Sequence, residues 1–174
     1  MTIPARAATK TFTIPIVNDT VGEPNETIPL SITDVSGGAI GGLGSTVVAI
    51  TDNEPTIFLS AASYSAAEPT AATPTVLTIT IRRTGTLTQV STVDYAIAAG
   101  TATQDVDYRM NPAGTPYSGK VTFAAGVASM LLKISILPDL VDEPDEIIGM
   151  ALSNATGAKL GTPNTALATI LDND

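Results

Sequence analysis

The chain has 174 residues and a formal net charge of −9, and 44% of its residues are hydrophobic although only 4% are aromatic. It contains no cysteine and no histidine, which excludes disulfides, zinc sites of the usual Cys/His kind and every catalytic triad that uses histidine. The negative charge argues against nucleic acid as a partner, because phosphate binding requires clustered Lys and Arg. No apolar stretch approaches the roughly 20 residues that span a bilayer, and the first residues do not form a signal peptide, so we expect no direct membrane insertion.

The chain contains an internal repeat. Residues 10–54 match residues 130–174 at a constant offset of 120, without a gap. Matched pairs include Ile14/Ile134, Ile16/Ile136, Asp19/Asp139, Glu23/Glu143, Pro24/Pro144, Glu26/Glu146, Gly37/Gly157, Asp52/Asp172 and Asn53/Asn173. A period of this size is that of a whole β-sandwich rather than of a solenoid coil. The sequence therefore predicts one complete copy over residues 55–174, preceded at residues 1–54 by the C-terminal half of another.

Period-two alternation marks the strands of the complete copy. Leu77, Ile79 and Ile81 alternate with polar residues, and the segments 93–97, 132–136 and 148–152 show the same pattern. Further strands are expected at 56–60, 120–123 and 166–171. About seven strands without helical periodicity predict an all-β, immunoglobulin-like antiparallel β-sandwich. Arg82 and Arg83, at the end of one strand, are interpreted as a solvated edge.

Acidic residues fall in the connections between these strands. If successive strands run antiparallel, the connections after 56–60, 93–97 and 132–136 and the end of 166–171 lie at one pole. Seven acids are expected there: Glu68, Asp107, Asp139, Glu143, Glu146, Asp172 and Asp174. Crowded carboxylates repel one another unless a cation neutralises them, and Ca²⁺ accepts six to eight oxygens at irregular angles. Each acid alone is more typical of a solvated turn, but their convergence favours a calcium site.

The truncated copy repeats part of this pattern. Its counterparts of the acids are Asp19, Glu23, Glu26 and Asp52, whereas nothing corresponds to Glu68 or Asp107. The recurrence predicts a second, weaker metal site, although shared ancestry alone would also produce it. Because half a sandwich exposes its core face, residues 1–54 are expected to be disordered, to dock on the complete copy, or to self-associate with another chain.

Several motifs of the complete copy resemble those of a known family. They are Ala67-Glu68, Val93-Asp94-Tyr95, Gly100-Thr101-Ala102, Asp107-Tyr108, Val121-Thr122-Phe123, Ala125-Gly126, the acidic run from Asp139 to Glu146, and the terminal Asp172-Asn173-Asp174. Together they resemble the Calx-beta family, the repeated calcium-binding sandwich of sodium/calcium exchangers, integrin β4 and many bacterial surface proteins.

The resemblance implies Ca²⁺ as the ligand and a particular set of residues that hold it. It adds the Val141 carbonyl and Asn173, the middle residue of the closing triplet, to the seven acids. Two departures imply fewer ions or lower affinity: Pro138 stands where the richest members have an acid, and Asn173 replaces a carboxylate.

Three functions remain open at this stage. The leading one is a calcium-binding structural or adhesion module of a larger extracellular or cell-surface repeat protein. Its partners would be neighbouring repeats of the same protein, and Ca²⁺ would stiffen the loops and the inter-repeat junction at Asp52-Asn53-Glu54-Pro55. The alternatives are a regulatory calcium sensor, the family's role in exchangers, and a metal-free sandwich spacer. Glycoside hydrolysis by paired carboxylates is disfavoured, because the chain has no Trp and only seven Tyr and Phe residues to form a sugar platform. We therefore expect no enzyme.

Overall fold

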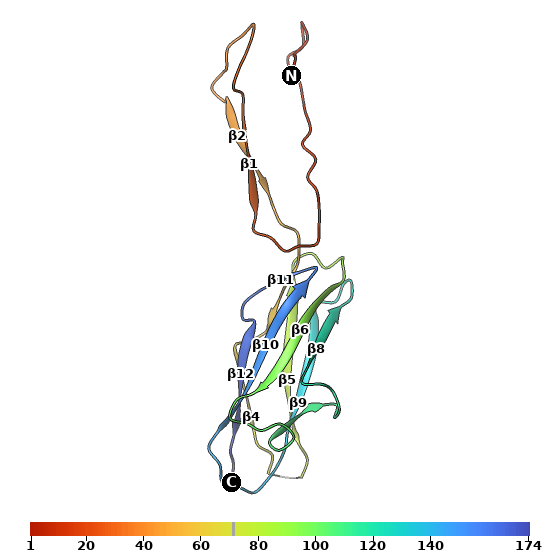
Figure 1. Ribbon diagram of the computed structural model, residues 1–174, viewed down its shortest axis with the longest axis vertical. Coiled ribbons are helices and arrows are strands. Elements are labelled where there is room, and N and C mark those ends of the chain that lie inside the picture. Colours follow the sequence, from red (N-terminus) through yellow and green to blue (C-terminus); the bar gives the residue numbers. More distant parts are fainter. Residues whose placement is uncertain (71) are drawn as a thin grey trace. The chain divides into compact units, whose positions relative to one another are not determined.

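A computed structural model describes residues 1–70 and 72–174 (Figure 1). Its regular structure within these ranges consists of strands, and they contain no helix long and apolar enough to cross a membrane. The residues group into two compact units. The hairpin unit comprises residues 1–19 and 25–50, and the sandwich unit comprises residues 20–24 and 51–174.

The hairpin unit is built around two antiparallel strands. β1 (Glu26–Ser31) pairs with β2 (Ser45–Ile50) from Glu26↔Ile50 to Ser31↔Ser45. Its large apolar side chains are poorly covered, with Leu43 93% and Phe12 63% exposed. Phe12, Leu30, Ile32 and Leu43 line a shallow apolar pocket within this unit. A two-stranded hairpin has too few strands to bury such side chains by itself.

Two five-stranded sheets form the sandwich unit. One sheet has the order β4-β12-β10-β6-β8 and the other the order β11-β3-β5-β9-β7. The strands are β3 (Thr56–Leu59), β4 (Ser63–Ala67), β5 (Thr75–Thr84), β6 (Ser91–Ala99), β7 (Tyr108–Asn111), β8 (Ser118–Phe123), β9 (Ser129–Ile136), β10 (Glu146–Thr156), β11 (Lys159–Leu160) and β12 (Thr165–Leu171). The predicted all-β sandwich is confirmed.

Alternating apolar residues place the core between the two sheets. Ile79 and Ile81 of β5, Val93 of β6, Ile134 of β9 and Ile148 of β10 are fully buried. Their neighbours in sequence point to the opposite face of each sheet, as the pleat requires. The core consists mostly of aliphatic side chains, with Tyr95, Tyr108 and Phe123 as its buried aromatics.

The strand predicted at 56–60 is followed by a second strand, which was not predicted, in the other sheet. β3 pairs antiparallel with β5, whereas β4, only a few residues later, pairs parallel with β12 in the opposite sheet. The short strands β7 and β11 extend the second sheet at its two edges. For this reason the described part of the complete copy contains more strand segments than its sequence predicts.

The interpretation of Arg83 as solvated is wrong. Its side chain is only 1% exposed, because the alternation that buries Leu77, Ile79 and Ile81 continues to Arg83 and leaves Arg82 outside. The guanidinium donates hydrogen bonds to the carbonyls of Val127, Gln89 and Ala124 and to the Ser91 hydroxyl, at 2.7–2.9 Å. It also lies 5.3 Å from the centroid of the Phe123 ring. Burial lowers the pKa of Arg83.

We expect Arg83→Met to destabilise the sandwich by about 2–4 kcal/mol, because the hydrogen bonds of the buried guanidinium to three carbonyls and to Ser91 would be lost. Urea denaturation followed by circular dichroism measures the change. The matched control is Arg82→Met on the same strand, which should remain within about 0.5 kcal/mol of the wild type. Equal effects of the two substitutions would contradict a structural role for Arg83.

Candidate metal centre

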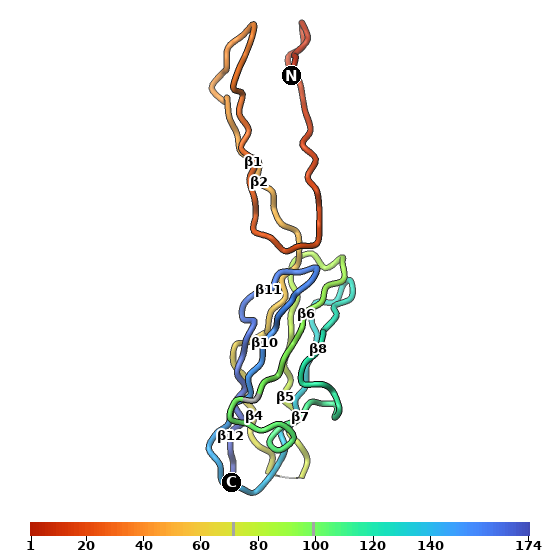
Figure 2. The backbone as a smooth tube through the Cα atoms, in the orientation of Figure 1, coloured from red at the N-terminus to blue at the C-terminus, as the bar shows by residue number. Residues whose placement is uncertain are grey.

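The predicted acids come from four segments that meet at one end of the sandwich unit. Figure 2 shows the connections after β4, before β7 and between β9 and β10 at the end where the C-terminus lies. The topology produces this arrangement because β4, β9 and β12 all run toward that end, whereas β7 and β10 begin there.

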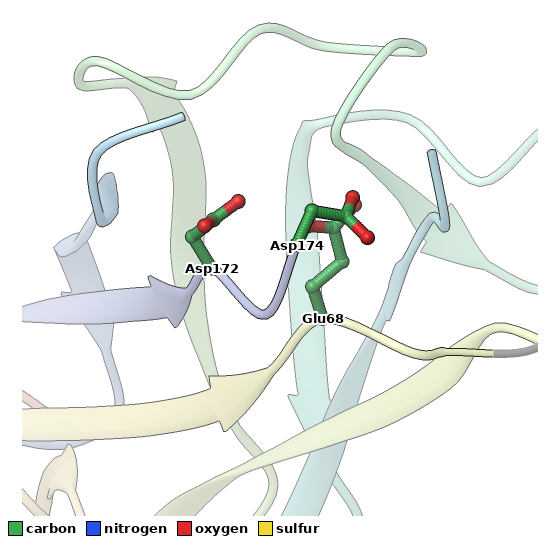
Figure 3. A group of neighbouring side chains, drawn as sticks. All are labelled: Glu68, Asp172 and Asp174. Atoms are coloured by element: carbon green, nitrogen blue, oxygen red, sulfur yellow. The ribbon is translucent and has the colours of Figure 1, made fainter. Parts of the chain in front are cut away.

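Parallel pairing of β4 with β12 places Glu68 beside Asp172. The last register pair is Ala67↔Leu171, and the Glu68 N–H donates to the Leu171 carbonyl at 2.9 Å. The segments that follow β4 and β12 therefore leave the sheet side by side. Figure 3 shows Glu68, Asp172 and Asp174 projecting from these two strand ends toward the same space.

Asp107 is positioned by the pairing of β7 with β9. Tyr108 pairs with Ile136, and the Leu137 N–H donates to the Asp107 carbonyl at 2.8 Å. The Asp107 carboxylate also accepts a 2.6 Å hydrogen bond from the Thr103 N–H. These contacts fix Asp107 at the start of the connection that carries Asp139.

Backbone amides of the β9–β10 connection bind the acids around it. The Asp139 N–H donates to Glu68 Oε1 at 3.0 Å, and the Glu143 N–H donates to Asp172 Oδ1 at 3.3 Å. Within the connection, the Val141 N–H donates to Asp139 Oδ1 at 2.8 Å. The connection is thus linked to the ends of both β4 and β12.

Six acids line one small cleft, together with apolar residues at its base. The lining residues are Glu68, Asp107, Leu137, Asp139, Glu143, Pro144, Glu146, Ile170 and Asp172. Carboxylate oxygens of two triads, Glu68–Asp172–Asp174 and Asp107–Asp139–Glu143, lie within 4.8 Å of one another in each triad. Two oxygens bound to the same Ca²⁺ can be at most about 5 Å apart, since each Ca–O bond measures about 2.3–2.6 Å. The donor type and the spacing both fit Ca²⁺.

Electrostatics at this end oppose ionisation of the glutamates. Burial, a hydrogen bond with Asp107 and the charges of Asp107, Glu143 and Glu68 raise the pKa of Glu146 to about 7. Burial and neighbouring aspartates also raise the pKa of Glu68 and of Glu143. A bound dication would favour the charged forms and remove this penalty.

The structure brings together all seven acids expected at this pole, namely Glu68, Asp107, Asp139, Glu143, Glu146, Asp172 and Asp174. The two additions from the resemblance are placed differently. The Val141 side chain is exposed, and its amide binds Asp139. The Asn173 side chain donates through its amide nitrogen to the Glu68 carbonyl, so this nitrogen links the ends of β4 and β12.

The set of four acids in the first copy is divided between the two units. Asp19 and Glu26 belong to the hairpin unit, whereas Glu23 and Asp52 belong to the sandwich unit. Within the sandwich unit the Glu23 N–H donates to Asp52 Oδ1 at 3.0 Å. A hydrogen bond from Lys159 and one from the Glu23 amide lower the pKa of Asp52.

Sequence reasoning missed the contribution of Asp145. Its Oδ1 accepts a 3.2 Å hydrogen bond from the Asp172 N–H. Asp145 therefore supports Asp172 from the neighbouring strand end. The signal was its place beside Glu146 in the acidic run, since antiparallel pairing of Glu146 with Ile170 brings the preceding residues toward the end of β12.

Comparisons with known proteins agree with the fold. A model of the Calx-beta domain matches residues 4–54 and 51–174. Sodium/calcium exchanger 1 of Bos taurus is 31% identical over 145 residues, which cover 72% of this chain and 14% of the exchanger. Adhesion G-protein coupled receptor V1 of Danio rerio is 30% identical over 174 residues, which cover 96% of this chain and 3% of the receptor. The chain thus spans a small part of either relative.

Solved structures resemble the sandwich in the same way. The apo form of the Calx CBD1 domain superposes with a TM-score of 0.59 at 25% identity, over 70% of this chain and 99% of the other. The calcium binding domain CBD12 of CALX1.1 gives a TM-score of 0.57 at 26% identity, over 68% of this chain and 44% of the other.

The raised pKa of Glu146 predicts that the calcium-free protein loses stability as pH rises. The folded state holds the Glu146 proton more tightly than the unfolded state, so this contribution is full below the ordinary value of 4.5 and is lost as pH rises through about 7. Glu146→Gln should therefore raise the Tm in chelator at about pH 8, by roughly 4 °C per 1 kcal/mol, and change it little at about pH 4. Differential scanning calorimetry measures both, with Asp34→Asn in the hairpin unit as control.

Proposed function

Because the chain belongs to the Calx-beta family, we propose that residues 55–174 form a non-catalytic module that binds Ca²⁺ at the acidic end of the sandwich. The observation that carries this proposal is the pair of carboxylate triads whose oxygens lie within calcium-bridging distance, 4.8 Å or less. All residues of the two triads except Asp174 line one cleft, and the triads come from four segments that are distant in sequence.

The proposed ligands are the carboxylates of the two triads, with Glu146 between them. Glu68, Asp172 and Asp174 would hold one ion, and Asp107, Asp139 and Glu143 would hold another. Hard oxygen donors on flexible loops suit Ca²⁺, whereas Mg²⁺ requires a near octahedron and retains its waters. The Val141 carbonyl, which the family resemblance implies, remains a proposed additional ligand, and the Asn173 oxygen could join the first ion.

Calcium binding would act on the loops. Without an ion, the charges of the β9–β10 connection repel Glu68, Asp107 and Asp172, although hydrogen bonds hold some of them together. A bound dication converts this repulsion into attraction and so orders the connection. Since the folded state alone forms the site, binding also stabilises the fold, by about 2.7 kcal/mol at a hundredfold excess over Kd.

We place this module in a larger extracellular or cell-surface protein, as a structural or adhesion repeat. Support comes from the tandem match of the family model and from the alignment with an adhesion receptor, which extends across 96% of the chain and so includes both copies. Neighbouring repeats of the same protein are the proposed partners.

A regulatory calcium sensor is the second candidate, and the similarity to a sodium/calcium exchanger favours it. The two functions differ in affinity. Extracellular modules bind Ca²⁺ with a Kd of roughly 10⁻⁴–10⁻³ M, and sensors bind with roughly 10⁻⁷–10⁻⁵ M. The uncharged Asn173 and Pro138 favour the weaker range. Isothermal titration calorimetry of the full chain decides between them.

The module should melt at a higher temperature in calcium than in chelator, and Asp107→Asn should remove most of that difference. With Ca²⁺ at tenfold Kd the expected stabilisation is about 1.4 kcal/mol, or roughly 5 °C for a domain of this size. Asp94→Asn is the matched control, because Asp94 pairs with Lys120 outside the cleft. Identical melting curves of the wild type in calcium and in chelator would reduce the module to a metal-free spacer.

We also propose that the hairpin unit associates with a second copy of this chain through its apolar side chains. Support comes from the exposed Phe12, Ile32 and Leu43, since clustered exposed apolar residues typically mark interaction sites. Sedimentation velocity should show a dimer that grows with protein concentration. Leu43→Glu should shift it toward monomer, whereas Leu140→Glu, at an equally exposed leucine of the sandwich unit, should not. A wild type that stays monomeric at all concentrations would exclude this association.

A further inference from the structure

The same hydrogen bond occurs in the acidic loop of each copy. In the complete copy the Glu143 N–H donates to Asp172 Oδ1 at 3.3 Å, and in the first copy the Glu23 N–H donates to Asp52 Oδ1 at 3.0 Å. The sequence offset of 120 relates both pairs. All four residues lie in the sandwich unit. In each copy the acidic loop, which precedes β10 in one and β1 in the other, is therefore hydrogen-bonded to a residue just after the last strand, β12 or β2.

The charge that faces this pair differs between the copies. Asp172 lies among Glu68 and Asp174, where carboxylates face carboxylates. Asp52 instead has the Lys159 ammonium 2.7 Å from its Oδ2, and the same ammonium donates to the Glu23 carbonyl. The Asp52 side chain is only 8% exposed. In the first copy, Lys159 thus binds a carboxylate and a carbonyl oxygen, which are two of the ligand types that Ca²⁺ takes.

The fold holds Lys159 in this position through its backbone. Lys159 begins β11, which pairs parallel with β3 in the register Lys159↔Thr56. Its N–H donates to the Pro55 carbonyl at 2.7 Å. Because Pro55 directly follows the junction residues 52–54, the lysine is attached to the strand that begins where the first copy ends.

Gly22 makes the close approach of Lys159 possible. A Cβ at residue 22 would lie 2.9 Å from the Lys159 backbone nitrogen and would also overlap its side chain. At the corresponding position the complete copy has Asp142. The first copy thus lacks a side chain where the lysine packs, and the complete copy has a bulky acid there. The steric difference between Gly22 and Asp142 is an observation separate from the Lys159–Asp52 ion pair, and both observations concern the same lysine.

We propose that Lys159 acts as a built-in cation that replaces calcium at the Glu23–Asp52 pair, so that the Asp52 carboxylate is balanced without a metal ion. An ammonium 2.7 Å from the carboxylate repels a second cation and occupies the oxygens that would bind it. The calcium predicted at the junction from the sequence is therefore replaced there by a lysine of the following repeat. The acidic end of the complete copy remains the calcium-responsive one, and that contrast depends on the function proposed above.

Amide hydrogen exchange of the full chain, measured by NMR, tests this inference. In the wild type the Glu23 amide should exchange at the same rate in calcium and in chelator. Lys159→Gln should accelerate Glu23 exchange roughly tenfold in chelator, because the carboxylate would lose its charged partner. The Glu23 amide should then become calcium-sensitive. Lys120→Gln is the matched control, since it removes another lysine that lies 2.7 Å from an aspartate, Asp94.

A second variant tests the steric part without removing the charge. Gly22→Asp should also accelerate Glu23 exchange, because the new side chain displaces Lys159. Slower Glu23 exchange in calcium for the wild type, or unchanged exchange in both variants, would overturn the proposal. The Glu143 amide reports separately on the proposed function. If the exchange rate of the Glu143 amide does not change with calcium while Lys159→Gln still accelerates exchange of the Glu23 amide, the calcium function fails and the lysine proposal stands.

Discussion

Parallel pairing of β4 with β12 is the interaction on which the acidic end depends. The chain crosses from one sheet to the other between β3 and β4. As a result, β4 lies beside the last strand, β12, in the same sheet. Because of that crossing, Glu68 leaves the same sheet as Asp172 and lies beside it. The pairing brings the first and last strand ends of the complete copy together, so the connection between β9 and β10 can bind to both.

The rest of the sandwich has to withstand the repulsion that this arrangement creates. Glu68, Glu143 and Glu146 all have raised pKa values, which means that the fold holds these carboxyls in places that disfavour their charge. Backbone amides of Asp139 and Glu143 offset part of this by donating to the acids. The aliphatic core, in which Ile134, Ile136 and Ile148 are fully buried, supplies the stability that keeps the strand ends in register.

Much of this could be predicted because period-two alternation and acid placement are local signals. The alternation of Leu77, Ile79 and Ile81 located a strand, and antiparallel succession of the strands was enough to gather the acids at one pole. Strand β4 was not predictable, since the short apolar segment at 56–60 does not show that the chain then changes sheets. Arg83 was misinterpreted because its charge outweighed the alternation that placed it inside. The contact between Lys159 and Asp52 joins residues 107 positions apart, and no pattern in the sequence marks it.

Repetition of one loop with two kinds of neutralisation separates geometry from charge in this family member. The hydrogen bonds from Glu23 to Asp52 and from Glu143 to Asp172 are of the same kind, so in each copy a backbone amide and an aspartate carboxylate close the loop. What a cation adds is relief of repulsion, and at Asp52 the Lys159 ammonium lies 2.7 Å from the carboxylate. Where three carboxylates converge, a monovalent group cannot balance them and no lysine from the described residues lies among the cleft's lining. A dication is then the simplest counter-charge, so under the proposed function the number of converging acids, and not the loop conformation, determines which end of a repeat responds to calcium.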